Sequence, residues 1–407
     1  MSETRQQAER AKQAYFKLQT MDRTAILHDL AKALRTCADV VFAANKKDLE
    51  AAKDTLSKPL YKRLVLDEPK LRDVIDGIEQ IAAMEDQVGR VMEETELDEG
   101  LLLKKIKTPI GVIAAIFESR PDVVPQVAAL ALRSGNAVLL KGGSEAAHTN
   151  AALGKVIRDA LSQHDIADAV QLVSTREEIA ELLKMDDLIS LVVPRGSNEM
   201  VRHIQEHTRV PVLGHADGIC HVFIDESADL EKAIRIAVDS KTQSPSACNA
   251  VETLLVHKRF PGMNELLEAL KSAGVDLRME SEFGQEFLDL ILSVRTVENL
   301  DEAIDHIRRY GSSHTDSIVT EDAASAQRFL DEVDSAGVYW NASTHFADGF
   351  RYGLGAEVGI STNRTHARGP VGVDGLMIYK YQLIGNGHIA ATYKGPNARP
   401  FTHRRRA

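Results

Sequence analysis

Two segments decide the fold, Gly111-Val-Ile-Ala-Ala-Ile-Phe117 and Ala137-Val-Leu-Leu-Lys141. Each is a short apolar run, and a helix-forming stretch at 123–133 lies between them. Strands that are apolar on both faces are typical of a parallel sheet with helices on both sides. The alternation therefore predicts an α/β fold built around a parallel sheet. Such sheets bind ligands beyond the carboxyl ends of their strands, here in the loops after Phe117 and Lys141.

The same alternation continues on both sides of these segments. We predict a helix at 145–161 and extended runs at 169–173, 188–193 and 210–213. Ser174-Thr-Arg-Glu177 fits a capping box that opens another helix. Residues 1–90 are predicted to be helical, because apolar residues such as Ile26, Leu27 and Leu30 recur at three- and four-residue spacing.

A second α/β unit is predicted from about Asp225. A helix at 230–238, a polar loop at 240–249 and a strand at 251–256 begin it, and strand–helix segments continue to about residue 339. The apolar stretch Leu376–Ile384 predicts a late strand. A terminal strand without an obvious partner often pairs with a neighbouring subunit, which favours a homo-oligomer.

Charge and hydropathy exclude several classes of protein. The chain of 407 residues has 49 basic and 60 acidic side chains and a net charge of −11, which argues against a nucleic-acid-binding protein. Its one basic run, Arg404–Arg406, is predicted to be a solvated tail. The longest apolar run, 109–117, is about half as long as a membrane span requires. The N-terminus is polar and lacks a secretory signal, so the expected location is the cytoplasm.

The three cysteines are too few and too scattered for a disulfide framework. No pair has C-x-x-C spacing, so the cysteines do not suggest a zinc site. Cys37 lies in a helical pattern and Cys220 before an apolar strand, and both are predicted to be structural. Cys248 differs, because it lies in the polar loop Ser244-Pro-Ser-Ala-Cys248-Asn249. The residues alone leave two interpretations open, a buried inert thiol or a nucleophile activated by loop amides and Lys241.

Two helix starts are suited to anions. Lys141-Gly-Gly-Ser-Glu145 joins a buried strand to a helix, and its glycines allow a ligand to approach the backbone. Arg195-Gly196-Ser197-Asn198 is a second such start. The first segment is also compatible with an ordinary turn, and no G-x-G-x-x-G fingerprint accompanies it. A glycine-rich stretch around Glu357 suggests close approach of the backbone to a ligand, although a surface loop would have the same composition.

His203-Ile-Gln-Glu206-His207 matches H-x-x-E-H, a zinc peptidase pattern. With 14 histidines in the chain, a chance match on a solvated helix face is the favoured interpretation. We therefore predict no metal. A zinc peptidase and a non-catalytic scaffold remain as alternatives from other classes, and stoichiometric zinc would indicate the peptidase.

Taken together, the segments resemble the aldehyde dehydrogenase superfamily, and specifically its members that reduce acyl phosphates. The resemblance covers nearly the whole chain. It is carried by four stretches: Pro109–Pro121, Ser134–Glu145, Lys241–His257 and Val297–Ile318, the last with Tyr310-Gly-Ser-Ser-His314-Thr-Asp316.

The resemblance implies a domain organisation. Residues 1–225 would form a Rossmann-type NADP-binding domain, with a β-hairpin near 98–115 for oligomerisation. Residues 226–362 would form the catalytic domain that carries Cys248, and residues 363–407 would return to the cofactor domain. Residues near Leu101–Thr108 would pair with the C-terminal strand in the oligomerisation element.

The resemblance also implies an activity, the NADPH-dependent reduction of L-glutamyl 5-phosphate to L-glutamate 5-semialdehyde in proline biosynthesis. Cys248 would be the nucleophile that forms a thioester, and Asn249 with the Cys248 backbone N–H would stabilise the oxyanion. Glutamate 5-kinase would supply the labile substrate, which makes a transient complex with the kinase plausible. Another oxidoreductase of the superfamily is the alternative.

The cofactor-binding residues follow from the same resemblance. Lys141 would bind the adenosine ribose, Gly196 and Ser197 the pyrophosphate, and Glu357 the nicotinamide-side ribose. Ser144 stands where many NAD-preferring members have a glutamate, which favours NADP.

Two positions depart from the wider superfamily. His215 replaces the glutamate base that activates water in aldehyde-oxidising members, as expected for a reductase that must avoid hydrolysis. Arg120 falls at about the position of the oxyanion-hole asparagine and would bind the substrate's phosphate or carboxylate. Ser244, where many such reductases have an arginine, is not expected to bind phosphate.

Overall fold

The computed structural model describes residues 2–215 and 217–406, which form two compact units. The first unit contains the described residues up to Val193, His207–Val212 and the residues from Gly372 onward. The second contains Pro194–Glu206 and Leu213–Val371. The expected boundary at 225 differs from this division because the strand β7 (Cys220–Ile224) pairs within the sheet of the second unit.

Five helices precede the first strand: α1 (Glu3–Leu18), α2 (Arg23–Thr36), α3 (Ala38–Ala52), α4 (Lys58–Leu64) and α5 (Glu68–Ala83). Short polar side chains begin three of them, because Ser2, Asp22 and Asp67 each accept a hydrogen bond from a backbone N–H of the first turn. Their apolar stripes are buried, including Ile26, Leu27 and Leu30. The predicted helical region is therefore confirmed.

The first unit contains a four-stranded sheet with the order β5-β4-β3-β6. Its strands are β3 (Val112–Phe117), β4 (Ala137–Lys141), β5 (Val170–Leu172) and β6 (Leu191–Arg195), and the helices between them are α6 (Val123–Arg133), α7 (Ala147–Ser162) and α8 (Arg176–Leu182). β4 pairs in parallel with both β3 and β5, and every residue of β3 is buried. The predicted parallel sheet is confirmed. The capping box lies one residue later than predicted, because Thr175 and Glu178 form it.

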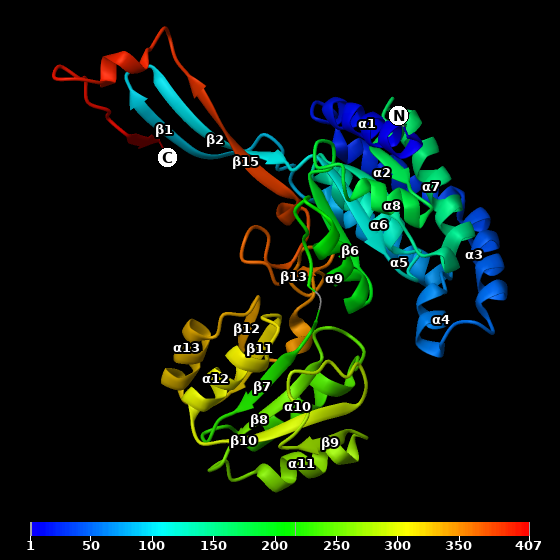
Figure 1. Ribbon diagram of the computed structural model, residues 1–407, viewed down its shortest axis with the longest axis vertical. Coiled ribbons are helices and arrows are strands. Elements are labelled where there is room, and N and C mark those ends of the chain that lie inside the picture. Colours follow the sequence, from blue (N-terminus) through cyan, green and yellow to red (C-terminus); the bar gives the residue numbers. More distant parts are fainter. Residues whose placement is uncertain (1, 216, 407) are drawn as a thin grey trace. The chain divides into compact units, whose positions relative to one another are not determined.

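An antiparallel sheet extends from the first unit with the order β15-β2-β1-β16. It consists of β1 (Val91–Asp98), β2 (Leu101–Pro109), β15 (Met377–Ile384) and β16 (Arg404–Arg406). Figure 1 shows β1, β2 and β15 running side by side, away from the helices of this unit. Ile378 pairs with Thr108 and Ile384 with Leu102, which confirms the predicted pairing of the late strand.

The basic run at 404–406 is exposed, as its composition predicts, but it forms the strand β16 and is not an unstructured tail. It pairs antiparallel with β1, and Arg406 lies 2.9 Å from the Glu96 carboxylate. Glu96 is buried and Arg404 also lies 3.4 Å from it, so the acidic strand neutralises the basic one. The pairing partner of the run could not be known from its own composition.

The second unit has a six-stranded parallel sheet with the order β12-β11-β7-β8-β10-β9. Besides β7, its strands are β8 (Val251–His257), β9 (Asp276–Met279), β10 (Ile291–Val297), β11 (Thr315–Val319) and β12 (Gly337–Trp340). Its helices are α9 (Asn198–His207), α10 (Leu230–Thr242), α11 (Met263–Ser272), α12 (Leu300–Tyr310) and α13 (Ala323–Glu332), and the short strands β13 (Ile360–Ser361) and β14 (Gly369–Pro370) follow. Every residue of β7, β8 and β11 is buried. Among the described residues, no helix combines the length and the apolar character that crossing a membrane requires.

α10 extends to Thr242, beyond the predicted helix end at 238, so the polar loop before β8 is shorter than expected. The extension places Lys241 in a buried ion pair. Lys241 Nζ, in the last turn of α10, lies 2.7 Å from Glu252 Oε2 in β8, and neither side chain is exposed. Burial lowers the pKa of Lys241 and raises that of Glu252 to about 7. The pair joins the two ends of the loop that carries Cys248.

We expect Glu252→Ala to lower the free energy of unfolding of the second unit by about 3–5 kcal/mol, because it leaves the Lys241 ammonium buried without a partner. Urea titration followed by fluorescence of Trp340, the single tryptophan, measures this. The matched control is Glu321→Ala, which removes an ion pair with Lys232 that is about half exposed and should change stability by less than about 1 kcal/mol. Equal losses of unfolding free energy in the two variants would contradict a stabilising role of the buried Lys241–Glu252 pair.

Candidate active site

Cys248 lies in the loop between α10 and β8 and is half-buried. Two tight turns shape this loop, because Ala247 N–H donates to Ser244 O and Ala250 N–H donates to Ala247 O, each at 3.0 Å. The Cys220 thiol donates to Cys248 O at 3.3 Å. Burial raises the pKa of the Cys220 thiol well above its usual value, so Cys220 stays protonated and supports the loop as a donor. Of these two cysteines, Cys248 is the accessible one.

Two histidines lie beside Cys248. One nitrogen of His215, one nitrogen of His314 and the Cys248 sulfur all lie within 4.8 Å of one another. The two rings meet edge to face, with centroids 4.8 Å apart. His314 directly precedes β11 and Cys248 shortly precedes β8, so both lie at the amino ends of strands in the same sheet. A thiol with an imidazole within reach is the usual arrangement of an activated cysteine nucleophile.

Hydrogen bonds define which nitrogens of these rings are available. His215 Nδ1 lies 2.6 Å from Ile360 O, and a carbonyl oxygen only accepts, so Nδ1 carries the hydrogen and Nε2 of the neutral ring has the lone pair. His314 Nδ1 is 3.0 Å from Thr315 Oγ1 and 3.6 Å from Cys220 Sγ. His314 Nε2 is buried and has no hydrogen-bond partner. The His215 ring therefore has its Nε2 lone pair available, and the Nε2 atom of His314 is not engaged in a hydrogen bond.

Gly218 lies against the nucleophile segment. A Cβ atom at this position would lie 2.3 Å from Cys248 O and 2.7 Å from Cys248 Cβ. Only glycine allows the two backbones to approach this closely. The Gly218 N–H donates to Glu286 Oε1 at 3.0 Å, which holds the segment in place.

Asn249 holds the loop from its other side. Its side-chain nitrogen donates to Ala347 O at 3.0 Å, and its oxygen lies 2.8 Å from His345 Nδ1. Asn249 and His345 are both buried. Burial lowers the pKa of His345 to about 4, so this ring is neutral near pH 7 and donates to the amide through Nδ1. In this conformation the Asn249 amide is engaged in positioning the loop.

Glu357 and the segment that opens α9 meet within the second unit. Arg195 Nη1 donates to Glu357 O at 3.3 Å, and its Nη2 lies 4.0 Å from Glu357 Oε1. Glu357 Oε2 accepts from the Gly349 N–H at 2.8 Å, and burial raises the pKa of the carboxyl group. Gly196 and Ser197 directly follow Arg195 and precede α9. The predicted pyrophosphate segment and the predicted ribose carboxylate are thus joined through Arg195.

The remaining predicted site residues lie in the first unit, at the carboxyl ends of neighbouring strands. Lys141 ends β4, and Ser144 begins the short 3-10 helix that follows it. Arg120 lies in the loop after β3, and this loop is tied to the other one because Ser119 N–H and Oγ both donate to Glu145 Oε1 at 2.6 Å. The loops after β3 and β4 are therefore joined at the carboxyl edge of this sheet.

The H-x-x-E-H side chains lie exposed on α9. Among the described residues, the group with suitable metal-ligand spacing is His215, Cys248 and His314 instead. This arrangement favours the solvated-face interpretation of the motif.

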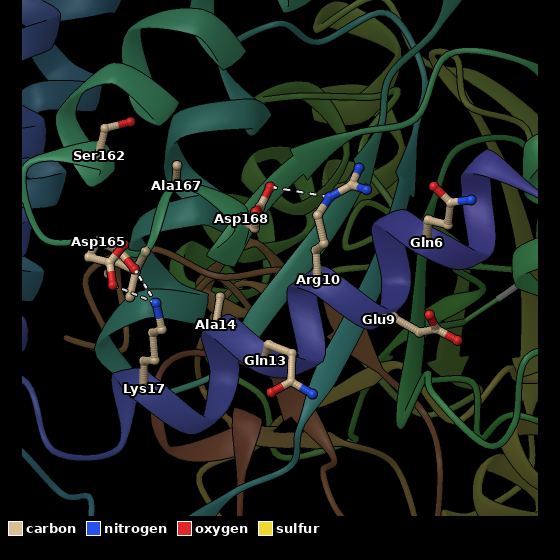
Figure 2. Close-up of a pocket in the computed structure, with 11 residues that line it drawn as sticks. Gln6, Glu9, Arg10, Gln13, Ala14, Lys17, Ser162, Asp165, Ala167 and Asp168 are labelled. Atoms are coloured by element: carbon tan, nitrogen blue, oxygen red, sulfur yellow. Dashed lines mark hydrogen bonds and ion pairs between the residues drawn. The ribbon is translucent and has the colours of Figure 1, made fainter.

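A separate pocket of about 660 Å³ lies in the first unit between α1 and residues 162–168. Figure 2 shows two ion pairs among its side chains, Lys17 with Asp165 and Arg10 with Asp168. None of the predicted site residues lines this pocket.

A sequence profile of the aldehyde dehydrogenase family matches residues 1–288. The chain belongs to this family. Within it, the chain is 49% identical over 405 residues to a gamma-glutamyl phosphate reductase of Trichodesmium erythraeum, a match that covers 95% of this chain and 94% of the relative. It is 51% identical to a protein of the same name from Pelotomaculum thermopropionicum, with 93% and 91% covered.

A solved structure supports the same relationship. The crystal structure of gamma-glutamyl phosphate reductase from Thermotoga maritima superposes with a TM-score of 0.92 at 36% identity, covering 95% of this chain and all of that one. An acetylating aldehyde dehydrogenase from Geobacillus thermoglucosidasius shares the fold with a TM-score of 0.69 at 18% identity. The predicted α/β fold of aldehyde dehydrogenase type is confirmed.

Reasoning from the sequence missed three parts of the site. The sequence assigns no role to His314, Gly218 or His345, although His314 lies in one of the four stretches that carry the resemblance. No local pattern marks Gly218 or His345, because each matters only through a contact with a distant segment.

We expect Gly218→Ala to destabilise the second unit by about 1–3 kcal/mol, because the added methyl group overlaps the Cys248 backbone. Gly214→Ala is the control, since its Cβ would be 3.5 Å from the nearest atom. Urea titration measures stability, and peptide mass spectrometry measures alkylation of Cys248 by iodoacetamide. A Gly218→Ala variant as stable as Gly214→Ala would contradict the close packing.

The neutral state of His345 makes stability depend on pH. Its folded pKa of about 4 lies below its ordinary value of 6.5, so the unfolded chain takes up the proton first as the pH falls. This contribution is complete above about pH 6.5 and is lost toward about pH 4, on the order of 2–3 kcal/mol. We expect the difference in unfolding free energy between the wild type and His345→Gln to shrink across this window. A difference in unfolding free energy that stays constant with pH would show that His345 is not held neutral in the folded protein.

Proposed function

We propose that this chain catalyses the NADPH-dependent reduction of L-glutamyl 5-phosphate to L-glutamate 5-semialdehyde with release of phosphate, a step of proline biosynthesis. The observation that carries the proposal is an accessible Cys248 beside two imidazoles. The chain is also about half identical, over nearly its whole length, to relatives named gamma-glutamyl phosphate reductase. This name denotes the reduction of an acyl phosphate.

Cys248 acts as the nucleophile. The lone pair on Nε2 of His215 accepts the thiol proton, and the thiolate attacks the acyl carbon of the substrate. The C–O bond to phosphate then breaks, phosphate leaves and a thioester to Cys248 remains. Phosphate is a good leaving group, so the enzyme has to position the carbonyl more than it has to activate it.

The tetrahedral oxyanion needs donors that are already in place. The Cys248 backbone N–H is the proposed donor. Asn249 is predicted from the resemblance to be a second oxyanion donor. Its amide nitrogen donates to Ala347 O in this conformation, so serving the oxyanion would require it to leave that contact. Arg120, in the first unit, is proposed to bind the phosphate or the carboxylate of the substrate.

His215 also explains why a thioester would survive. A carboxylate in its place would activate water by removing a proton. His215 Nδ1 is held by Ile360 O, which fixes the ring with Nε2 available. Because His215 accepts the thiol proton, its ring is a cation once the thioester has formed and cannot act as a base toward water.

The residues that would hold a nicotinamide cofactor fit such a group. Lys141 offers a cation at the end of β4, and a Cβ atom at Gly142 would overlap Asn150 Nδ2 at 2.2 Å, so the loop backbone has room only for glycine. Ser144 places no negative charge that would repel a 2′-phosphate, which favours NADP. The segment Gly196–Ser197 would bind the pyrophosphate and Glu357 the nicotinamide-side ribose. When bound, the cofactor supplies the hydride.

We also propose a homo-oligomer and a cytoplasmic location. β15 is the edge strand of its sheet, and Tyr381 and Leu383 on it are 60% and 59% exposed. An exposed apolar edge strand of this length favours a second copy as its partner. Because an acyl phosphate hydrolyses readily, transient association with the glutamate 5-kinase that supplies it is part of the proposal.

The reverse reaction tests the function, since glutamyl phosphate is unstable. We expect the protein to reduce NADP continuously in the presence of glutamate semialdehyde only when phosphate is added, because phosphate must attack the thioester carbonyl and release the Cys248 thiolate before the next turnover. NADPH absorbance measures the rate. Cys248→Ser should lower it by at least about 1,000-fold, whereas Cys37→Ser, in the first unit, should leave it unchanged.

Equal rates without phosphate would mean that water resolves the thioester, as in an ordinary aldehyde dehydrogenase. A Cys248→Ser variant that keeps a substantial rate would overturn the mechanism. Replacing NADP with NAD in the same assay decides the cofactor preference.

A further inference from the structure

We infer that His215, Cys248 and His314 form a zinc site that traps the nucleophile in an inactive state. The three side chains offer two imidazole nitrogens and one sulfur within 4.8 Å of one another. Imidazole and thiolate are the preferred ligands of Zn²⁺. The metal site rests on these three side chains alone, and only its inhibitory effect rests on the proposed function.

The hydrogen bonds around the rings match those of metal-binding histidines. A ligating histidine usually donates its other N–H to a carbonyl or carboxylate, which presents the free nitrogen to the metal. His215 does this through Nδ1 and Ile360 O at 2.6 Å. The His314 ring is positioned by Thr315 Oγ1 and Cys220 Sγ around its Nδ1.

An independent observation points to a ligand. His314 has no exposed surface, and its Nε2 has no hydrogen-bond partner. A buried imidazole nitrogen without a partner is unfavourable. Among the described residues His221, His306 and His345 share this feature, but His314 is the one of the four that also lies in the cluster with Cys248. Coordination of a cation would satisfy this nitrogen.

The geometry requires only a small closure. Zn–N bonds of about 2.0 Å and Zn–S bonds of about 2.3 Å at tetrahedral angles place the ligands about 3.5 Å apart. Cys248 lies on a loop and is half-buried, so rotation about its Cα–Cβ bond can bring the sulfur toward the rings. The rings are held more firmly than the cysteine.

Binding is balanced by the release of one proton. Zn²⁺ forms a bond to the Cys248 sulfur and two bonds to imidazole nitrogens, and the thiol proton passes to solvent. Water takes the fourth position, as in other three-ligand zinc sites. The sulfur lone pair is then committed to the metal and cannot attack an acyl carbon.

Metal titration of the full chain tests the site. After removal of metal with a chelator, Zn²⁺ is added in competition with a chromophoric chelator. We expect one ion per chain, and at least about tenfold weaker binding for Cys248→Ser and for His215→Ala. His203→Ala, on the exposed face of α9, and Cys37→Ser are matched controls that should bind as the wild type does. His314→Gln is a third ligand variant, and circular dichroism verifies that it folds. If His314→Gln does not fold, His215→Ala still tests the histidine ligands.

Cobalt provides a spectroscopic readout. Co²⁺ should give a thiolate-to-metal charge-transfer band in the wild type that is absent in Cys248→Ser. Zn²⁺ should also slow alkylation of Cys248 by iodoacetamide at least about tenfold, and a chelator should restore it. Binding that persists unchanged in Cys248→Ser, or that is lost in His203→Ala, overturns the site, as does the absence of stoichiometric binding.

The zinc site and the proposed function can fail separately, because binding, cobalt spectra and alkylation need no turnover. Stoichiometric zinc bound through Cys248, with no phosphate-dependent NADP reduction by the metal-free protein, supports the site and refutes the function. Turnover by the metal-free protein that stoichiometric zinc leaves unchanged overturns the inhibitory role.

Discussion

The parallel pairing of β11, β7 and β8 is the constraint on which the candidate site depends. Neighbouring parallel strands begin at the same edge of a sheet, so residues that precede each strand are brought together however far apart they lie in the chain. His314 precedes β11, Gly218 precedes β7 and Cys248 precedes β8. The nucleophile therefore meets its imidazoles at the amino edge of this sheet, whereas Lys141 and Arg120 lie at the carboxyl edge of the other sheet.

Buried polar contacts keep the nucleophile loop in one conformation. The Lys241–Glu252 pair joins the helix before the loop to the strand after it, and Asn249 is held between His345 and Ala347. These groups are out of contact with water, so each has to be paired within the protein. Such pairing restricts alternative conformations of the loop. Cys248 itself remains the half-exposed member of the group.

The same donor atoms suit two kinds of chemistry. An imidazole lone pair can accept the proton of a neighbouring thiol, which makes a nucleophile, and the resulting thiolate with imidazole nitrogens makes a zinc ligand set. A site arranged for nucleophilic attack by a cysteine therefore also offers ligands to zinc.

The sequence by itself determined the α/β architecture, the helical start of the chain and the segments that carry Cys248, Lys141 and Glu357, because apolar periodicity and glycine-rich turns are local properties. It also determined the family, through stretches long enough to exclude chance. Only the tertiary structure decided that Arg404–Arg406 forms a strand against β1, that Asn249 is engaged with His345, and that His314 faces the nucleophile. All three depend on contacts between residues that are distant in the chain. For His345 and the basic run, the contacting residues are more than 90 positions apart. Such contacts leave no periodic signal in the chain, since they arise from the packing of whole elements rather than from the neighbours of a residue.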